Sequence, residues 1–446
     1  MRPQVSNGPS LWCCEFEMTG PGGFWGPTAV QGQEAARVLV RYHGHPMGYL
    51  TLPMHGAPPD EKLCRATAIV QLQVPIASHR TADGLLATGH GGDVDLPRPT
   101  PGDPSGVQCP STVSADELFS VVVCTRDRGE GLRGCLEMLG KLAYGNLEIL
   151  IVDNAPSDDR TQRTVAEMAA HDDRFRYLLE PRPGLSYARN RGLNEARGRF
   201  LAYTDDDVMV DPGWIKGLTQ GFKRSPSVGC VTGLVCTAAI TNASEAYFDA
   251  RSPSWSARFE PELFDMGDNR REGALYPYSA GIYGTGANCA FDRALLGSVG
   301  PFDEALGAGS RTKGGEDLDM FLRVLLAGRA IAYEPSAIVW HHHRADPEGL
   351  LHQMFGYGSG LAAFLAKCVS HRTTRADVLR RVVPGVGRLF DIKSKTDARL
   401  LGKTAPPPGA LRREVAGYIC GPLLYFQAKR SVKQLASRGP GSDNHA

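Results

Sequence analysis

Short apolar runs alternate with amphipathic stretches through the middle of the chain. The runs have the length and the β-branched or aromatic content of buried strands. They are Phe119–Cys124, Leu147–Val152, Arg174–Leu179, Phe200–Tyr203 and Val228–Val235. Helical patterns fall between them, at Leu132–Lys141, Thr161–His171, Ser186–Arg197 and Gly213–Arg224. Strands that alternate with helices at this spacing predict βαβ units and an α/β fold with a mostly parallel sheet flanked by helices.

The flanking regions read differently. Residues 1–35 have no clear periodicity, whereas Ala36–Leu52 predicts a hairpin and Asp60–Leu72 a helix capped by Asp60. We therefore expect a small N-terminal α+β extension and a C-terminal helical segment around the central domain. The expected divisions are an N-terminal extension over 1–79, a Pro/Gly-rich linker over 80–116, the α/β domain over 117–370 and a helical tail over 371–446.

Composition narrows the class of protein. The 446 residues include 49 Lys+Arg and 48 Asp+Glu, a net charge of +1, which argues against a protein that binds bulk nucleic acid. The eleven cysteines are scattered without a CxxC pair, so we expect neither a disulfide framework nor a cysteine zinc site, and a reducing compartment. No apolar run reaches the length of a membrane span and no signal-like segment opens the chain, so the expected location is cytoplasmic.

The C-terminal segment allows two interpretations. Val415–Phe426 is apolar, and Arg412-Arg413, Lys429-Arg430 and Lys433 flank it. We favour a helix packed on the domain. The alternative is peripheral contact of residues 412–433 with a membrane, at the inner face of the plasma membrane. Gly421-Pro422 would weaken a helix in either case.

An acidic cluster, Thr204–Asp211, follows one predicted strand directly. Ligands of such sheets bind beyond the carboxyl ends of the strands. Side chains at i and i+2 of an extended segment point the same way, so Asp205 and Asp207 are placed to share Mn²⁺ or Mg²⁺ while Asp206 points elsewhere. The alternative is an Asp-rich turn that caps the following helix.

Two further groups of polar residues carry candidate chemistry. Glu316 and Asp317 stand at the start of a predicted helix after two glycines, where they either cap the helix or supply a carboxylate general base. His341-His-His-Arg344 follows another strand. It is either a solvated polar stretch or a source of an imidazole metal ligand and a phosphate-binding arginine.

These residues resemble a known family over about 118–365. The order of motifs is similar to that of the family 2 glycosyltransferases, which have the GT-A fold, and specifically to non-processive enzymes of actinobacterial type. The matching motifs are Cys124-Thr-Arg-Asp-Arg128, Val152-Asp-Asn-Ala-Pro-Ser-Asp158, Gly184-Leu-Ser-Tyr-Ala-Arg-Asn-Arg-Gly192, Asp205–Asp207 and Gly284-Thr-Gly-Ala-Asn288. Gly314-Gly-Glu-Asp317 also resembles a stretch of animal galactosyl- and N-acetylgalactosaminyltransferases. In the latter a metal-binding His follows, which favours His341 and, second, His343.

The resemblance implies a role for each matching residue. Metal ligands would be Asp205, Asp207 and His341, and the general base Asp317, with Glu316 beside it as a second catalytic candidate. Nucleotide-sugar binding would fall to Thr125, Arg126, Asp153, Arg189, Asp205 and Asp206, and the acceptor side to Gly286, Ala287 and Asn288.

The activity implied is metal-dependent transfer of a hexose from a UDP- or dTDP-sugar to a hydroxyl. The acceptor would be a glycan, a lipid-linked molecule or a small molecule, in cell-envelope or polysaccharide biosynthesis. Asp317 favours inversion, because a related pattern with Asn at that place belongs to retaining enzymes.

Departures from the family pattern leave rival readings. Arg126 replaces the usual aromatic residue, and the missing Gln-x-x-Arg-Trp motif disfavours a processive polymer synthase. A sugar-1-phosphate nucleotidyltransferase would need a Gly-x-Gly-Thr-Arg loop, which Cys124–Gly129 is not. A non-catalytic protein that binds sugar nucleotides or glycans is the other alternative. Retention of Asp205, Asp207, Asp317 and His341 together argues against it.

Overall fold

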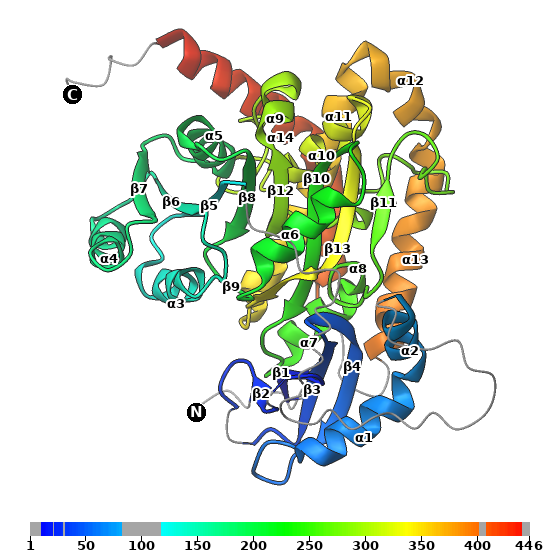
Figure 1. Cartoon of the computed structure of the whole chain (residues 1–446). Helices are drawn as coiled ribbons and strands as arrows, with labels where there is room; N and C mark the ends of the chain where they lie inside the picture. Colours follow the sequence, from blue (N-terminus) through cyan, green and yellow to red (C-terminus); the bar gives the residue numbers. More distant parts are fainter. Residues whose placement is uncertain (1–9, 21, 30–31, 83–116, 401–406, 439–446) are drawn as a thin grey trace, which may run out of the picture.

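The computed structural model describes residues 10–20, 22–29, 32–82, 117–400 and 407–438 (Figure 1). Its centre is a mixed, mostly parallel sheet in the strand order β11-β13-β10-β12-β8-β5-β6-β7, with the short β9 paired to β13. The strands are β5 Phe119–Thr125, β6 Leu147–Asn154, β7 Phe175–Glu180, β8 Phe200–Asp205, β9 Val208–Val210, β10 Val228–Thr237, β11 Glu262–Phe264, β12 Asn288–Asp292 and β13 Ala330–His341. Strand β12 runs antiparallel to both β8 and β10 and so joins two parallel groups, β7-β6-β5-β8 and β10-β13.

Helices cover both faces of this sheet. One apolar layer joins α3, α4 and α6 to side chains such as Val121 and Ile149, and the other joins α5, α9 and α10 to side chains such as Val122 and Leu150. Neighbouring residues of one strand thus enter opposite cores, as an alternating backbone requires. The helices are α3 Gly129–Gly140, α4 Arg160–Ala169, α5 Leu185–Glu195, α6 Trp214–Lys223, α7 Ala243–Arg251, α8 Pro253–Ser256, α9 Arg293–Val299 and α10 Glu316–Leu326. The predicted α/β class and the five predicted strands are confirmed.

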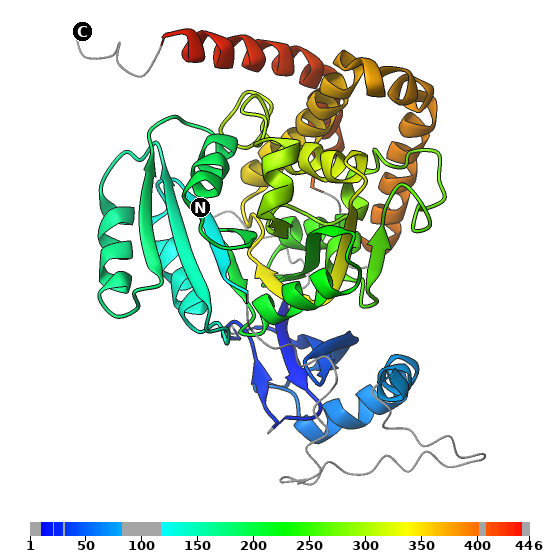
Figure 2. The same cartoon turned by 45° about the horizontal axis from the view of Figure 1, so that its top comes forward.

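A second, four-stranded sheet lies below the large one in Figure 1 and Figure 2. Its strands are β1 Leu11–Glu17, β2 Phe24–Trp25, β3 Ala35–Tyr42 and β4 His45–Pro53, and α1 Glu61–Gln71 and α2 Gln73–Ala82 follow. The predicted hairpin is β3–β4, and Asp60 caps α1 by accepting a hydrogen bond from the Leu63 amide. The sequence did not predict β1. Its middle residues are buried on both faces, so they give no alternating pattern.

The small sheet is joined to the large one through apolar and charged contacts. Cys13 and Leu39 pack against β10 and β13, in a cluster that includes Leu234 and Trp340. Two ion pairs cross the same boundary. Arg37 Nη1 lies 2.5 Å from Asp249 Oδ1, and Arg41 Nη1 lies 2.5 Å from Asp211 Oδ2. These arginines are largely buried. Removal of Asp249 would leave the buried charge of Arg37 without its carboxylate, whereas Arg41 would keep a second pair, with Glu15 at 2.9 Å, if Asp211 were removed.

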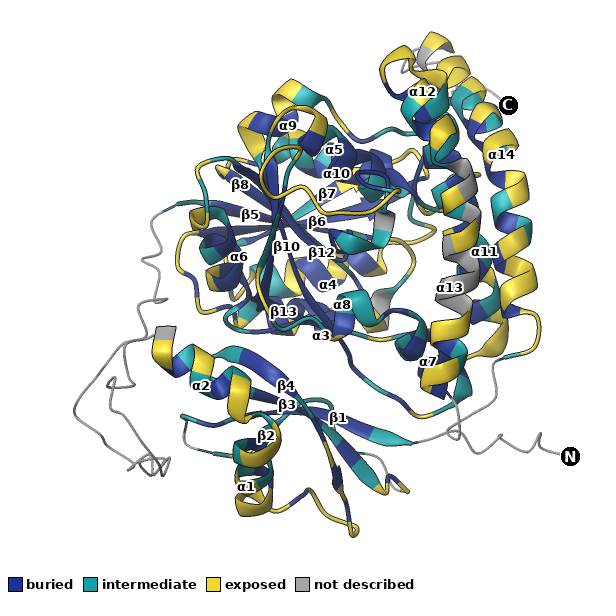
Figure 3. Cartoon of the chain, turned by 90° about the vertical axis from the view of Figure 1, so that its right-hand side faces the viewer, coloured by how far each residue is buried: buried dark blue, intermediate teal, exposed yellow. Residues whose placement is uncertain are grey.

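Long helices complete the chain beside the large sheet (Figure 3). They are α11 Pro347–Ser370, α12 Arg372–Arg380, α13 Val382–Leu400 and α14 Ala410–Arg438. Helix α14 continues through Pro422. Gly417 and Gly421 bring it close to α11, since an added Cβ at Gly417 would lie 2.3 Å from the Phe355 carbonyl oxygen. Among the described residues, no helix combines the length and the apolar character that a bilayer crossing requires. The predicted linker over 80–116 lies outside the described residues, apart from positions 80–82, which form the end of α2.

Candidate functional site

A cavity of about 1600 Å³ opens beyond the carboxyl ends of β5 and β8. Its floor is formed by residues after these strands, and its other walls come from the 271–287 segment, the start of α10 and the C-terminal helices. Most of the predicted site residues line it. They are Thr125, Arg126, Arg189, Asp205, Asp206, Asp207, Gly286, Ala287, Glu316, Asp317 and His341. A topological switch beside β8 brings these residues together, because β12 interrupts the parallel order there.

Asp205, Asp207 and His341 form a compact group with metal-ligating side chains. Their ligand atoms lie within 4.8 Å of one another, and His341 Nε2 is 3.3 Å from Asp207 Oδ1. Asp205 ends β8, and the antiparallel pairing of β9 with β13 places His341 opposite Val208, one residue past Asp207. Two carboxylates and one imidazole make a donor set that suits Mn²⁺, and Mg²⁺ less well.

The pKa values of Asp205, Asp207 and His341 are shifted in different directions. Burial raises the pKa of Asp205 to about 6, with Arg189 opposing and Asp207 adding to the rise. Burial would also raise the pKa of Asp207, but His341, Arg128 and Arg344 outweigh it and the pKa falls below its usual value. The pKa of His341 is lowered, chiefly by burial, which favours the neutral imidazole that can bind a metal.

The third aspartate of the cluster points elsewhere, as predicted from its position. Asp206 Oδ2 accepts a hydrogen bond of 2.7 Å from the Thr125 hydroxyl, and Asp206 Oδ1 lies 3.8 Å from Arg128 Nε. Burial raises its pKa to about 6. Arg128 also donates to Asp207 Oδ2 over 3.1 Å, so it lies between the two carboxylates. Thr125 at the end of β5 and Arg128 just after it thus hold the acidic cluster in place.

Asp317 faces the cavity from the first turn of α10. Its Oδ2 accepts a hydrogen bond of 3.0 Å from the Gly286 amide, and its Oδ1 accepts one of 2.8 Å from the Leu318 amide. The preceding Gly315 has a φ of +94°, and a Cβ there would lie 2.5 Å from the Gly360 carbonyl oxygen. Glycine is therefore required at the helix start that orients this carboxylate.

Glu316 has a different environment from its neighbour. It is buried, and its Oε1 lies 3.2 Å from Arg189 Nη1. Burial raises the pKa of Glu316 to about 7, Asp317 adds to the rise and Arg189 opposes it. Arg189 also lies 3.9 Å from Asp205 and donates to the Gly286 carbonyl over 3.2 Å. Glu316 and Arg189 thus connect the acidic cluster to the 284–288 segment.

Two predicted nucleotide-binding residues differ in their access to the cavity: Arg126 lines it, whereas Asp153 is fully buried and is not among the described residues that line it. Arg126 lines it with a side chain that is 49% exposed, so its guanidinium plane is accessible to a base. Asp153 is buried next to the lining residue Asn154, and its Oδ2 accepts a hydrogen bond from the Tyr177 hydroxyl. Burial raises the pKa of Asp153. Its Oδ1 has no hydrogen-bond partner among the described residues.

Asn288 does not have the environment expected of an acceptor-side residue. It is fully buried and is not among the described residues that line the cavity. Its Oδ1 accepts a hydrogen bond from Trp214 Nε1, and its Nδ2 donates to the carbonyls of Leu234 and Ala337. All of these partners lie within the large sheet or the helix on its face. The structure therefore corrects the prediction for Asn288, whose amide crosslinks β10, β12, β13 and α6.

We expect Asn288→Ala to lower the free energy of unfolding by about 3 kcal/mol, because it leaves a buried indole N–H and two buried carbonyls without partners. Urea unfolding followed by fluorescence measures the change. Asn194→Ala, on the exposed side of α5, is the matched control and should change the free energy by less than about 0.5 kcal/mol. Equal stability of the two variants would contradict this role for Asn288.

His343, the second histidine candidate, lies behind His341. The two Nδ1 atoms are 3.2 Å apart, and His343 Nε2 is 3.1 Å from the Thr237 hydroxyl. Thr237 in turn donates to Asp249 Oδ1, which pairs with Arg37 of the small sheet. A chain of polar contacts therefore leads from the N-terminal sheet to His341.

Three aromatic residues of the cavity were missed by the sequence analysis. Phe248 and Trp255 from α7 and α8 and Tyr357 from α11 have ring centroids 5.9–6.2 Å apart. Trp255 Nε1 has no hydrogen-bond partner among the described residues. Aromatic faces with a polar edge suit a ligand that is apolar on one side and hydroxylated on the other. These residues belong to no sequence motif, and only the fold brings them together.

Comparison with known proteins relates part of the central domain to a known family. Residues 120–296 match the family model of Glycosyl transferase family 2. That segment contains the first sheet strands, the acidic cluster and the 284–288 segment. The segment is therefore similar to the glycosyltransferases of family 2.

Three relatives illustrate the range of similarity. The uncharacterized protein y4gI of Sinorhizobium fredii is 28% identical over 51% of this chain and 25% of its own length. The pre-mycofactocin glycosyltransferase of Mycobacterium tuberculosis is 27% identical over 61% of this chain and 54% of its own length. The glucosyl-dolichyl phosphate glucuronosyltransferase of Haloferax volcanii is 27% identical over 54% of this chain and 74% of its own length. The chain thus spans about half or less of the first two relatives.

Among solved structures, the mannosyltransferase PcManGT from Pyrobaculum calidifontis, in complex with GDP-Man and Mn²⁺, resembles this chain with a TM-score of 0.45. The two share 16% identity over 85% of this chain and 99% of the other.

Proposed function

We propose that this protein is a non-processive, metal-dependent glycosyltransferase that moves a hexose from a UDP- or dTDP-sugar to a hydroxyl acceptor, with inversion. The observation that carries the proposal is the convergence of Asp205, Asp207 and His341 on the same cavity as Asp317. The family 2 match over residues 120–296 supports the nucleotide-sugar donor.

The donor would lie over the carboxyl ends of β5 and β6. Asp153, whose Oδ1 has no hydrogen-bond partner within the described part of the chain, would accept a hydrogen bond from the base, and Arg126 would stack on the same base. Thr125 would contribute to donor binding by orienting Asp206, to which its hydroxyl donates a hydrogen bond. Arg128 and Arg344 lie within 4.0 Å of Asp207 and would face the diphosphate as cationic partners.

Asp205, Asp207 and His341 would hold Mn²⁺ or, with a poorer match to the imidazole, Mg²⁺. When bound, such an ion neutralises the negative charge that develops on a diphosphate leaving group. Arg189, held by Glu316, would keep Asp205 oriented toward this group.

On the acceptor side, Asp317 would accept the proton of the attacking hydroxyl. The hydroxyl oxygen would attack the anomeric carbon as the bond to the diphosphate breaks, and the proton would pass to Asp317 Oδ2 or Oδ1. Gly286 and Ala287 would border the acceptor. A single displacement of this kind inverts the anomeric configuration.

The direct test is nucleotide release from a panel of UDP-, dTDP- and GDP-sugars with Mn²⁺, with Mg²⁺ and with a chelator. We expect release from a UDP- or dTDP-sugar that the chelator abolishes. Because donor hydrolysis without an acceptor is slow, binding of each sugar nucleotide is measured by calorimetry in the same panel. A protein that neither binds nor cleaves any donor would refute the proposal.

A further inference from the structure

Helix α14 has one face packed on the protein and an opposite face that is apolar and exposed. The packed face consists of Glu414, Gly417, Gly421, Tyr425 and Ala428. The exposed apolar residues are Leu411, Val415, Ile419, Leu423 and Phe426, with exposed fractions of 40%, 41%, 75%, 62% and 46%. Spacings of three and four residues place them in one line along the helix. We call these five residues the α14 stripe.

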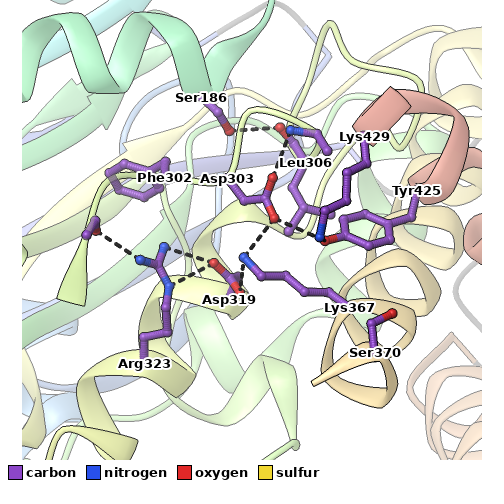
Figure 4. A network of polar contacts seen from close by, with 12 residues as sticks. Ser186, Phe302, Asp303, Leu306, Asp319, Arg323, Lys367, Ser370, Tyr425 and Lys429 are labelled. Atoms are coloured by element: carbon purple, nitrogen blue, oxygen red, sulfur yellow. Dashed lines mark hydrogen bonds and ion pairs between the residues drawn. The ribbon is translucent and has the colours of Figure 1, made fainter. Parts of the chain in front are cut away.

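The helix is fixed so that the stripe faces outward. The Tyr425 hydroxyl lies 3.2 Å from Asp303 Oδ2, and Lys367 bridges Asp303 and Asp319 at 2.7 and 2.9 Å (Figure 4). At the other end, Glu414 pairs with Arg251 at 2.6 Å. Rolling the helix to bury the stripe would break both anchors and expose a buried carboxylate.

Basic residues flank the stripe at both ends. Arg412 and Arg413 lie beside its first residue, Leu411, and Lys429, Arg430 and Lys433 follow its last residue, Phe426. The one acidic residue of α14, Glu414, lies on the packed face. The outward surface of α14 is thus apolar along its middle and positively charged at its ends, and Figure 3 shows this side of the helix as largely exposed.

We propose that the α14 stripe docks on an anionic lipid bilayer, with the helix lying in the plane of the interface. Apolar side chains would enter the acyl boundary while the flanking arginines and lysines contact the headgroups. A second copy of the chain fits less well. Pairing of two stripes in either direction would bring basic ends together without any carboxylate to neutralise them. Since no described helix is long and apolar enough to cross a bilayer, contact at the surface is the mode that α14 allows.

The same helix connects the stripe to the cavity. Glu414 and Tyr418 line the cavity that contains Asp317, and Tyr425 is linked through Asp303 and Lys367 to the α10 residue Asp319. A docked α14 would therefore hold the acceptor side of the cavity beside the membrane. This step rests on the proposed function, and it favours a lipid-linked acceptor over a free glycan.

The test is flotation of the full chain with large vesicles of phosphatidylcholine alone or with phosphatidylglycerol. We expect at least about tenfold tighter binding to the anionic vesicles, weakened by high salt. The Ile419→Glu/Leu423→Glu variant should lose at least about tenfold in vesicle affinity. Val70→Glu/Val74→Glu, at apolar positions 74% and 78% exposed on α1 and α2, is the matched control and should bind normally.

Arg430→Glu/Lys433→Glu should lose the preference for anionic lipid, and circular dichroism should show all three variants folded. Absence of vesicle binding, or equal loss in the Val70/Val74 control, would overturn the proposal. A dimer seen by light scattering and disrupted by the stripe variant, without vesicle binding, would assign the stripe to a second copy. Vesicle binding does not need a donor, so its outcome is independent of the nucleotide-release test.

Discussion

Asp317→Asn is expected to lower kcat for transfer by about 10²- to 10⁴-fold, the range in which a positioned general base contributes. The substitution keeps the size of the side chain but removes its ability to take a proton. The amides of Gly286 and Leu318 hold the native carboxylate, so one of them would face the new NH₂ group. Affinity for the donor should change little, because the proposed role of Asp317 is to act on the acceptor.

Steady-state kinetics with a donor and an acceptor separate these effects, and calorimetry measures donor affinity alone. Asp173→Asn, on the exposed turn before β7, is the matched control and should retain native kinetics. Glu316→Gln is tested in parallel. If Asp317→Asn kept the native kcat while Glu316→Gln lost activity, Glu316 would be the general base and our assignment would be wrong. The anomeric configuration of the product, read by NMR, decides whether transfer inverts.

Asp207→Asn is expected to lower kcat/KM by about 10³-fold, since a metal contributes several kcal/mol of charge stabilisation to such a displacement. Asp207 is the acidic residue closest to His341, and it interacts with Arg128 and Arg344 as well. The proposed metal ligands are two carboxylates and one imidazole. Replacing the carboxylate of Asp207 should therefore remove most of the affinity for Mn²⁺. Titration of Mn²⁺ followed by electron paramagnetic resonance measures that affinity without any turnover.

The neighbouring Asp206→Asn variant is the control for this prediction. This variant removes the same charge one residue away. The native Asp206 carboxylate accepts a hydrogen bond from Thr125 and does not belong to the metal-ligating group. Mn²⁺ affinity should therefore fall much less in Asp206→Asn than in Asp207→Asn. Equal losses in the two variants would show that charge, and not coordination by positions 205 and 207, accounts for the effect.

Local pattern was sufficient to predict β5, β6, β7, β8 and β10 of the large sheet and most of the cavity floor, whereas β9, β11 and β12 were not predicted. Val121 to Val123 and Ile149 to Ile151 are buried runs whose length and β-branched content mark strands. Ligands bind beyond the carboxyl ends of parallel strands, and this rule predicts that Thr125 and Asp205 lie at the same site. The alternation of side chains in an extended segment separated Asp206 from its two neighbours, in agreement with its bond to Thr125.

Other features depend on contacts between residues far apart in the chain. Asn288 stands in a motif typical of the family, but whether its amide faces a ligand or the sheet depends on Trp214, Leu234 and Ala337. Similarly, nothing local distinguishes Phe248 and Trp255 from ordinary core aromatics. Strand β1 escaped prediction because burial on both faces removes the alternation on which strand prediction relies.

The polar chain from Arg37 to His341 is a continuous set of contacts through which the N-terminal sheet and the metal-ligating group can be coupled. Arg37 fixes Asp249, and Thr237 and His343 extend the contact to the ring of His341. If docking of the small sheet orients His341 for a metal, linkage requires that the metal strengthen docking by the same factor. A divalent cation would then stabilise the association of the two sheets, and its concentration would set how tightly the small sheet is held on the large one.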